Sequence, residues 1–269
     1  MTTSPAAEFL EHALEIARGA AAAAGELIAR HFARGVQVET KPDATPVTIA
    51  DREAEDTIRR LLLRAFPGHA ILGEERGREG ESEFLWLVDP LDGTKSFVRG
   101  TPFFSTQIAL MHRGELVLGV SSAPSYGGAA GETAWARKDG GAFLDAKPIR
   151  VSAAREFDAG TAISIGNVKT LTRDARWNTL GDLIRRSGRI RGYGDFLHYH
   201  LLASGRIDLV IESDVNILDI AALAVIVREA GGVFTTLEGG ALDLHTTGVL
   251  AGTPALHAQA LALFQAAAT

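Results

Sequence analysis

The chain has 269 residues, of which 46% are hydrophobic and 22% charged, so it is long enough to bury a large globular core. It contains no cysteine, which excludes disulfides, thiolate metal sites and thiol nucleophiles and leaves oxygen or imidazole ligands for any metal. The formal net charge of -6 argues against a nucleic-acid-binding surface. No segment approaches the roughly 20 apolar residues that cross a bilayer. We therefore expect a cytoplasmic protein that binds neither nucleic acid nor membrane.

The first predicted element is a long alanine-rich helix over residues 4–34, with Ser4 as its N-cap and Pro5 in its first turn. A turn containing KPDATP leads into VTIADREAEDTIRRLLLRAF, whose apolar spacing after Asp51 is helical. Asp51 is therefore expected near the start of a second helix. The charged segment RGREGESE, residues 76–83, is typical of a mobile surface loop.

A short apolar strand is predicted over residues 84–88, and the Asp89-Pro90 pair is expected to end it abruptly in a loop. Two further strands, TQIALMH and LVLGVSSAP, are separated by the turn residues Arg113 and Gly114. Hairpins are expected around GETAWARKDGGAFL. The first half of the chain, residues 1–150 in round numbers, thus reads as helices followed by strands.

The second half, about residues 151–269, alternates strands and helices. A strand TAISI precedes a polar helix near residues 173–186, and the helical segment FLHYHLLASG precedes the strand IDLVIES. Asp219 opens the helix DIAALAVIVREAGG, which two late strands, VFTTLEG and GVLAGT, and a terminal helix follow. Because no repeat or low-complexity linker separates the halves, we expect one continuous α/β unit over residues 1–269.

Acidic residues stand beside apolar segments at four separated places in the chain. They are Asp51, Glu74 in ILGEERG, Asp89 and Asp92 in DPLDGT, and Asp219 in NILDIAA. Carboxylates next to buried strands are costly unless they are paired or bound to cations, and Asp-x-x-Asp around a tight turn can direct two of them at neighbouring ions. By itself the spacing is more often that of a plain turn with a helix N-cap, since Asp, Gly and Thr are favoured in both settings.

Taken in order, these motifs resemble those of the inositol monophosphatase family, over nearly the full chain. The resemblance rests on Asp51 in VTIAD, the G-E-E loop at residues 73–75, D-P-x-D-G-T at residues 89–94, and Asp219 followed by AA and EAGG. It implies a layered αβαβα sandwich, a homodimer, and an active site between the two halves. Two departures are Leu218, where the family usually has an aromatic residue, and Ile49, where relatives often have a polar one.

The resemblance also implies that each active site binds two or three magnesium ions. The implied ligands are Glu74, Asp89 and the backbone carbonyl of Leu91 for the first ion, Asp89, Asp92 and Asp219 for the second, and Glu74 with Asp51 near a weaker third. Thr94, with Glu74 or Asp51, would orient the attacking water. Backbone N–H groups of Gly93 and Thr94 would hold the phosphate, with Asp219 also adjoining the substrate.

This ligand set suits the hydrolysis of a small phosphate monoester without an enzyme nucleophile. Bound metal lowers the pKa of water, and two ions about 3.5–4 Å apart stabilise both the attacking and the leaving oxygen. Magnesium prefers a few carboxylates plus substrate phosphate to a cage made only of protein groups. The sequence therefore predicts a magnesium-dependent phosphoric monoester hydrolase.

The segment from Gly194 to Asp219 most resembles the histidinol-phosphatase branch of the family, through its G-D-F string and Glu212, and the run KPDATPVT agrees. Histidinol phosphate carries an ammonium group and an imidazole, which carboxylates at Asp195 and Glu212 would bind well. Carboxylates also accept hydrogen bonds from sugar hydroxyls. An inositol monophosphatase, a broader sugar-phosphate or nucleotide-phosphate phosphatase, and a non-catalytic metal-binding relative therefore stay as alternatives.

The string HYH contains two histidines, His198 and His200, two residues apart in a predicted helix. Helical metal-binding pairs stand three or four residues apart, because only these positions share a face. We therefore expect structural or substrate-lining roles for both imidazoles.

Overall fold

The computed structural model describes residues 6–35, 38–40, 46–128 and 130–267. The chain begins with two long helices, α1 (Ala7–Arg34) and α2 (Ile49–Ala65), connected through the hairpin β1 (Val38–Thr40) and β2 (Pro46–Thr48). Helix α1 ends before Gly35, whose φ of 74° is one that glycine adopts readily. The predicted cap residues Ser4 and Pro5 and residues 41–45 of the predicted turn lie outside the described residues.

An eight-stranded sheet follows, and its strands occur in the order β10-β9-β8-β7-β6-β5-β3-β4. Only β3 and β5 pair in parallel among these neighbours. The strands are β3 (Ala70–Gly73), β4 (Gly77–Glu79), β5 (Phe84–Asp92), β6 (Ser105–His112), β7 (Glu115–Ala123), β8 (Glu132–Arg137), β9 (Ala142–Leu144) and β10 (Lys147–Ile149). The short helix α3 (Thr94–Val98) stands between β5 and β6.

The second sheet has five strands in the order β12-β11-β13-β15-β14, with β12, β11 and β13 parallel. The strands are β11 (Ala162–Ile165), β12 (Arg189–Arg191), β13 (Leu209–Ser213), β14 (Val233–Thr236) and β15 (Gly248–Gly252). The helices of this half are α4 (Arg176–Arg186), which a 3-10 turn (Thr170–Arg173) precedes, α5 (Asp195–Ala203), α6 (Ile217–Glu229) and α7 (Pro254–Ala267).

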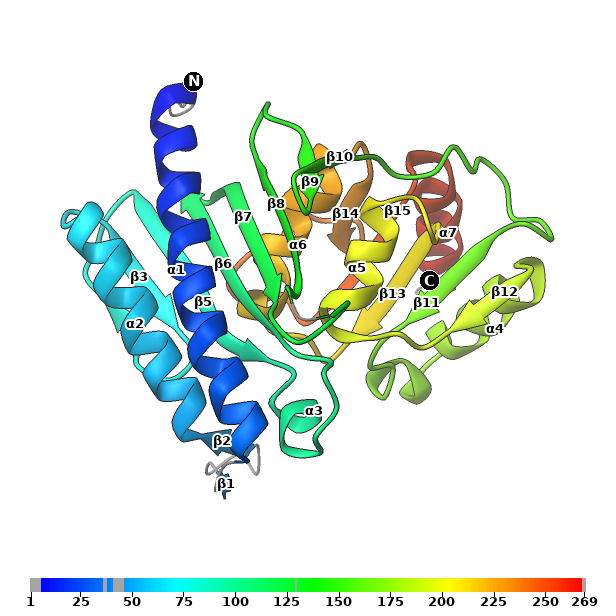
Figure 1. Ribbon diagram of the computed structural model, residues 1–269. Coiled ribbons are helices and arrows are strands. Elements are labelled where there is room, and N and C mark those ends of the chain that lie inside the picture. The colour runs from blue at the N-terminus through cyan, green and yellow to red at the C-terminus, as the bar shows by residue number, and fades with distance from the viewer. Residues whose placement is uncertain (1–5, 36–37, 41–45, 129, 268–269) are drawn as a thin grey trace.

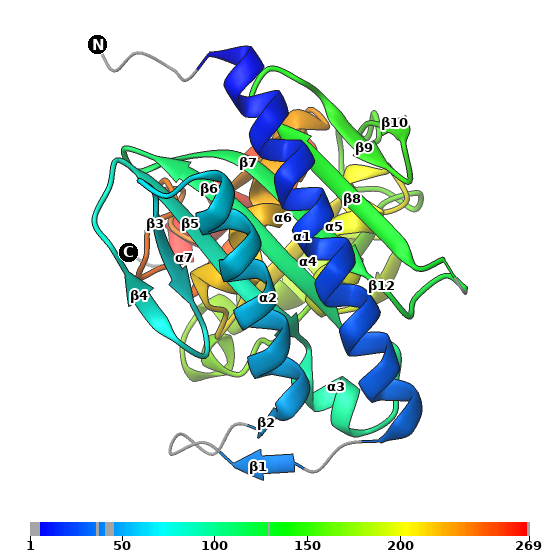
Figure 2. The same cartoon turned by 60° about the vertical axis from the view of Figure 1, so that its left-hand side comes forward.

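These elements form five layers. Helices α1 and α2 pack on one face of the large sheet, α5 and α6 lie between the two sheets, and α4 and α7 cover the far face of the small sheet (Figures 1 and 2). Alternate residues of the strands are divided accordingly, because successive side chains point to opposite faces. On β5, for example, Trp86 packs in the cluster under α1 and α2, whereas Leu87 packs in the cluster around α6. The predicted αβαβα sandwich is confirmed.

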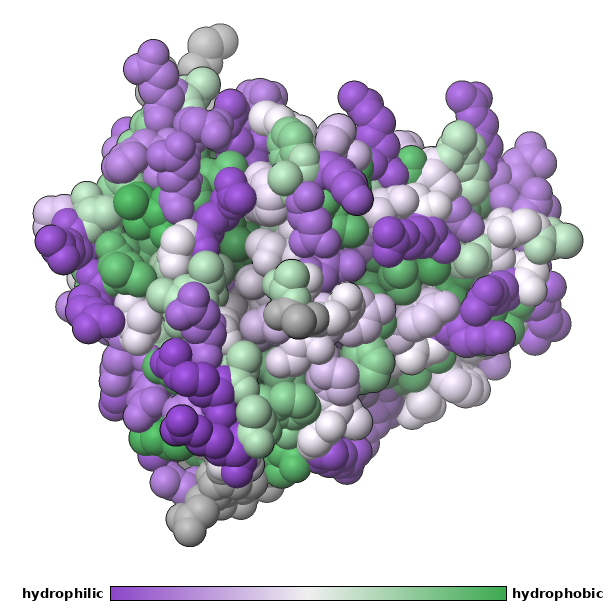
Figure 3. Space-filling view, viewed as in Figure 1, coloured by the Kyte–Doolittle hydropathy of each residue, from purple (hydrophilic) through white to green (hydrophobic). Residues whose placement is uncertain are grey.

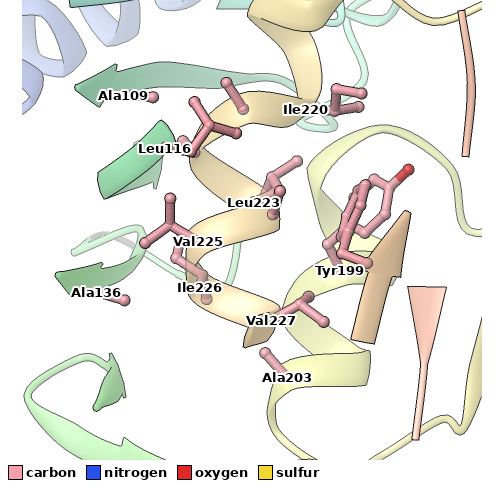
Figure 4. Close-up of a cluster of buried hydrophobic side chains, with 14 of the residues drawn as sticks. Ala109, Leu116, Ala136, Tyr199, Ala203, Ile220, Leu223, Val225, Ile226 and Val227 are labelled. Carbon is pink, nitrogen blue, oxygen red and sulfur yellow. The ribbon is translucent and has the colours of Figure 1, made fainter. Parts of the chain in front are cut away.

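Helix α6 is buried on all sides at the centre of the molecule (Figure 4). Its small residues allow it to approach the large sheet closely, and a Cβ on Gly119 of β7 would lie 2.3 Å from the carbonyl oxygen of Ala222. Leu223 and Val225 of this helix belong to the apolar cluster packed around it (Figure 4). Leu218, in place of the usual aromatic residue, is 5% exposed and belongs to the same core. Close packing against β7 therefore fixes where the N-terminus of α6 lies.

The face of the molecule seen in Figure 3 carries hydrophilic side chains throughout, with apolar residues in small groups between them. Ile49, the second departure from the family pattern, is among the exposed apolar residues, 46% accessible. Among the described residues, no helix has the length and apolar character that crossing a membrane requires.

Two sequence predictions about the large sheet were wrong. Strand β5 does not end before Asp89 but runs on to Asp92, and a register irregularity between Asp89 and Asp92 absorbs Pro90, which has no N–H to donate. The segment RGREGESE is not wholly a loop, since residues 77–79 form the edge strand β4. Arg78 is exposed on this strand, and exposed charge is usual on an edge strand.

Candidate active site

The turn that follows β5 has a conformation available only with glycine at one position. Gly93 has a φ of 86°, and a Cβ on it would lie 2.6 Å from the carbonyl oxygen of Phe103. Within the turn, Asp89 Oδ1 accepts a hydrogen bond from the N–H of Leu91 at 2.9 Å, and Asp92 Oδ2 accepts one from Ser105 Oγ at 3.3 Å. Asp89 and Asp92 are both buried, 2% and 9% exposed. The backbone thus holds these two carboxylates in buried positions.

Asp219 reaches these two aspartates from the first turn of α6. It is the third helical residue, and its Oδ2 accepts a hydrogen bond from the N–H of Asn216, which caps the helix in return. One oxygen from each of Asp89, Asp92 and Asp219 lies within 4.8 Å of the others. Such a set of hard oxygen donors fits Mg²⁺.

Glu74 joins the site because β3 and β5 pair in parallel. Gly73, the last residue of β3, lies opposite Val88 of β5, and the N–H of Glu74 donates to the Val88 carbonyl at 3.2 Å. Since parallel strands end at the same edge of a sheet, Glu74 and Asp89 meet there. Glu74 lines the same cavity as the three aspartates.

Glu55 of α2 holds the loop that carries Glu74 through hydrogen bonds to its backbone. The Glu55 carboxylate accepts the N–H of Glu75 at 2.6 Å and that of Arg76 at 3.0 Å, and it forms an ion pair with Arg59 at 2.7 Å. Glu55 is fully buried, and a Cβ on Gly73 would collide with it. Sequence reasoning missed Glu55, although it stands four residues after Asp51 and so shares its helix face.

Asp51 lies behind the site and does not line the cavity. It is 1% exposed, and its Oδ2 accepts hydrogen bonds from both the N–H and the hydroxyl of Thr48 at 2.7 Å. Its Oδ1 lies 3.1 Å from the hydroxyl of Thr94, which is also 2.9 Å from the Leu91 carbonyl. Asp51 therefore contacts the site through Thr94.

The cavity between the two sheets has a volume of about 260 Å³. It brings together all the predicted site residues except Asp51: Glu74, Asp89, Leu91, Asp92, Gly93, Thr94, Asp195, Glu212 and Asp219. Further lining residues that were not predicted include Asn167, Tyr199, Asp214 and Val215. No local pattern marks these four, since only the packing of β11, β13 and α5 brings them to the cavity.

The lining is strongly acidic. Seven carboxylates line the cavity, and among the described residues Lys95 is the one cationic side chain there. Burial, with the charges of Glu74, Asp92 and Asp219, raises the pKa of Asp89 well above its usual range. Burial and the neighbouring acids likewise raise the pKa of Asp92. The pKa of Asp219 rises to about 7, chiefly through burial. The donor chemistry and this mutual repulsion both fit bound cations.

Asp195 and Glu212 line the same cavity from α5 and β13. Burial alone would raise the pKa of Glu212, but His198 at 3.1 Å and the hydroxyl of Tyr199 at 2.7 Å outweigh it and lower that pKa. Burial and the charge of Glu212 instead raise the pKa of Asp195. Asp195 also has a φ of 46°, which is uncommon for a residue other than glycine.

The two histidines of HYH point in different directions, as the helical spacing predicts. His198 contacts Glu212, whereas His200 lies 2.8 Å from both Glu132 Oε1 and Ser121 Oγ. His198 thus supports a cavity-lining carboxylate from behind, and His200 belongs to the core between the sheets.

Known proteins are similar to this chain in sequence and in fold. The inositol monophosphatase family model matches residues 10–269. The chain is 41% identical to a histidinol-phosphatase of Mycobacterium tuberculosis, over 78% of this chain and 81% of that protein. It is 36% identical to an inositol-1-monophosphatase of Caulobacter vibrioides, over 96% of this chain and 100% of that protein. The structure of the extragenic suppressor protein SuhB from Bartonella henselae superposes with a TM-score of 0.84 at 32% identity, covering 93% of this chain and 97% of that one. The chain therefore belongs to the inositol monophosphatase family of phosphatases.

Proposed function

We propose that the protein hydrolyses L-histidinol phosphate to L-histidinol and phosphate with the help of magnesium. The observation that carries the proposal is the surplus of acids in the cavity, where Asp195 and Glu212 line the same space as Glu74, Asp89, Asp92 and Asp219. The last four suit cations that bind the phosphate, and Asp195 and Glu212 suit a positively charged alcohol half. The similarity to a histidinol-phosphatase supports this choice of substrate.

The magnesium ligands of the proposal are the carboxylates of Glu74, Asp89, Asp92 and Asp219 and the carbonyl of Leu91. When bound, the ions supply a water of lowered pKa and offset the charge of the phosphate. A third ion near Glu74 and Asp51 is part of the prediction from the family resemblance.

Residues of the chain are suited to position the attacking water, the phosphate and the ammonium group of the substrate. The hydroxyl of Thr94, placed between Asp51 and the Leu91 carbonyl, is suited to hold a water and to pass its proton towards Asp51, which has an elevated pKa because it is buried. Gly93 gives the phosphate close access to the backbone, because it has no side chain. Asp195 is the residue that we assign to the ammonium of the substrate. A cation bound there offsets the repulsion between the carboxylates of Asp195 and Glu212.

The alternatives are separated by one assay. Phosphate release by the purified protein is measured on L-histidinol phosphate and on inositol 1-phosphate at matched concentrations, each with Mg²⁺ and with EDTA. We expect Mg²⁺-dependent release with a clear preference for histidinol phosphate. A preference for inositol 1-phosphate favours the second candidate, which the similarity to an inositol-1-monophosphatase supports. No release under any condition leaves the non-catalytic, metal-binding alternative.

We further propose that the protein works as a cytoplasmic homodimer, as the family resemblance implies. The subunit mass is 28.5 kDa, so sedimentation velocity should give about twice this value. A monomer at micromolar concentration would contradict this part of the proposal.

A further inference from the structure

A row of polar side chains runs from the cavity into the core between the two sheets. It follows two cross-strand pairs, Asp92 opposite Ser105 and Gln107 opposite Ser121. Ser105, Gln107 and Ser121 are all fully buried. Ser105 and Gln107 occupy the face of β6 that continues in Ala109 and Met111, members of the apolar cluster around α6. Polar groups in such a place are costly, so their contacts need an explanation.

The contacts form a continuous chain. Gln107 Nε2 donates to Ser105 Oγ at 2.8 Å and to Ser121 Oγ at 3.0 Å. Ser105 Oγ in turn donates to Asp92 Oδ2 at 3.3 Å. At the other end, Ser121 Oγ lies 2.8 Å from His200 Nε2, and His200 Nδ1 lies 2.8 Å from Glu132 Oε1. The chain therefore joins a buried carboxylate of the cavity to Glu132 at the edge of the core.

The proton positions follow from donor counting. The amide of Gln107 uses one hydrogen on each serine, so both hydroxyl protons point away from it. The hydroxyl proton of Ser105 therefore points to Asp92, and the hydroxyl proton of Ser121 points to His200 Nε2. His200 is therefore the Nδ1–H tautomer, which donates to Glu132. The hydrogen bond that Ser105 Oγ donates to Asp92 Oδ2 stabilises the charged form of Asp92. The other carboxylate oxygen, Oδ1, takes no part in this hydrogen bond.

Gln107 makes this arrangement at a cost. Its Oε1 is buried without a hydrogen-bond partner, the only such side-chain atom among the described residues. A residue chosen for packing alone would avoid this, because an apolar side chain of the same length leaves no atom unsatisfied. The orphan oxygen thus favours a role for the amide hydrogens.

We propose that Ser105 and Gln107 are positioning residues for Asp92, anchored through Ser121 to the His200–Glu132 pair. Ser105 holds the carboxylate of Asp92 in the orientation in which it binds a divalent cation, and Gln107 directs the hydroxyl of Ser105. This rests on the proposed role of Asp92 as a magnesium ligand. Groups that orient a metal ligand from behind typically affect metal affinity by about ten- to a hundredfold.

The test is Mg²⁺ binding by titration calorimetry on the full chain, with the unfolding midpoint of the metal-free protein measured in parallel. Ser105→Ala should weaken Mg²⁺ binding about tenfold. Ser105→Thr, which keeps the hydroxyl, should restore most of it. Gln107→Met should weaken binding in the same direction while lowering the metal-free midpoint by no more than about 3 °C, because it also removes the orphan oxygen.

The matched control is Ser122→Ala, which removes a neighbouring buried hydroxyl whose contact, Thr133 Oγ1 at 3.1 Å, does not lead to Asp92. It should leave Mg²⁺ affinity unchanged. Adding Gln107→Met to Ser105→Ala should cost nothing further, since Gln107 acts through Ser105. Equal Mg²⁺ affinity of Ser105→Ala and Ser122→Ala, or losses that multiply in the double variant, overturns the positioning role of Ser105 and Gln107 and leaves the proposed function standing. No Mg²⁺ binding by the unsubstituted protein overturns the proposed function as well.

A second measurement requires no metal. The imidazole ¹⁵N shifts of His200 should show the neutral Nδ1–H tautomer, assigned by their loss in His200→Phe. The Nε2–H tautomer or an imidazolium at neutral pH would contradict the direction of the hydrogen bonds.

Discussion

The acidic residues of the cavity differ in what surrounds them, and this separates their proposed roles. Glu212 is held by His198 and Tyr199, which lower its pKa, so it is a fixed negative charge. Burial and the charges of neighbouring acids instead raise the pKa values of Asp89, Asp92 and Asp219. The first arrangement suits a permanent contact to substrate, and the second suits ions that remove the repulsion.

Asp92→Asn tests the metal site at the scale of a single residue. The amide removes a negative donor from the Asp89, Asp92 and Asp219 set but keeps its size, so we expect phosphate release to fall by at least about 10³-fold at saturating Mg²⁺. The far-ultraviolet circular dichroism should not change. Turnover close to that of the unsubstituted protein would contradict the proposed ligand set.

Asp195→Asn tests the alcohol side of the cavity. Asparagine tolerates the positive φ of this position, so the change removes the charge without straining the backbone. We expect kcat/KM for L-histidinol phosphate to fall about 10- to 100-fold, the loss expected for one charge-assisted contact, with a smaller effect on inositol 1-phosphate. Equal losses on both substrates would argue that Asp195 does not select the positively charged alcohol.

At the scale of an element, α2 supports two loops of the site from one face. Asp51 contacts Thr94 of the turn after β5, and Glu55, one helical turn on, holds the loop that carries Glu74. The helix thus sets the distance between the two loops. The sequence motif VTIAD places Asp51 at a helix start, but Thr94 and the loop N–H groups that Asp51 and Glu55 contact follow β5 and β3, some 20 to 43 positions further along the chain.

Glu55→Gln should loosen the Glu74 loop. It removes the negative charge nearest to the buried guanidinium of Arg59, so we expect the free energy of unfolding to drop by about 3 kcal/mol, together with weaker Mg²⁺ binding. Asp56→Asn is the control on the adjacent residue, because Asp56 forms an exposed ion pair with Arg76. That change should cost less than about 1 kcal/mol. Urea denaturation measures both, and equal losses would contradict the role given to Glu55.

The same elements show why part of the fold was predictable. The hairpin of β6 and β7 follows from two apolar runs around Arg113 and Gly114, both of which have positive φ. Strand β4 was not predicted, since its three residues are charged or glycine and their pairing with β3 provides the only signal. Strand β5 was predicted too short, because its pairing with β6 continues past Pro90 in spite of the local break.

At the scale of the whole molecule, the clustered acids make stability depend on pH and on metal. A carboxyl whose pKa is raised on folding contributes stability that is fully present below its unfolded pKa and is lost as the pH rises through its folded pKa. For Asp219 this window runs from about 4 to about 7, and Asp89 and Asp92 act in the same direction. The metal-free protein should therefore lose this contribution across that range.

The difference between the unfolding midpoints with Mg²⁺ and with EDTA should accordingly grow from pH 5 to pH 8. Mg²⁺ competes with protons for these carboxyls, so it stabilises the folded protein most where they are ionised. Using the difference between the two midpoints cancels the contributions of groups that metal does not contact, such as His69 and His257, whose imidazole pKa values desolvation lowers. A difference that is constant with pH would contradict binding at this cluster.

The sequence by itself determined the chemistry of this protein: the acids, the glycine of the turn, and the helix starts at Asp51 and Asp219. These depend on neighbours within a few residues, through caps, turns and alternation, and so they can be read locally. Only the tertiary structure decided which of them meet. Glu74 reaches Asp89 because two strands pair in parallel, Asp51 lies behind Thr94, and Asp92 is linked through Ser105 to His200. These contacts join residues tens of positions apart, and they exist only once the layers pack.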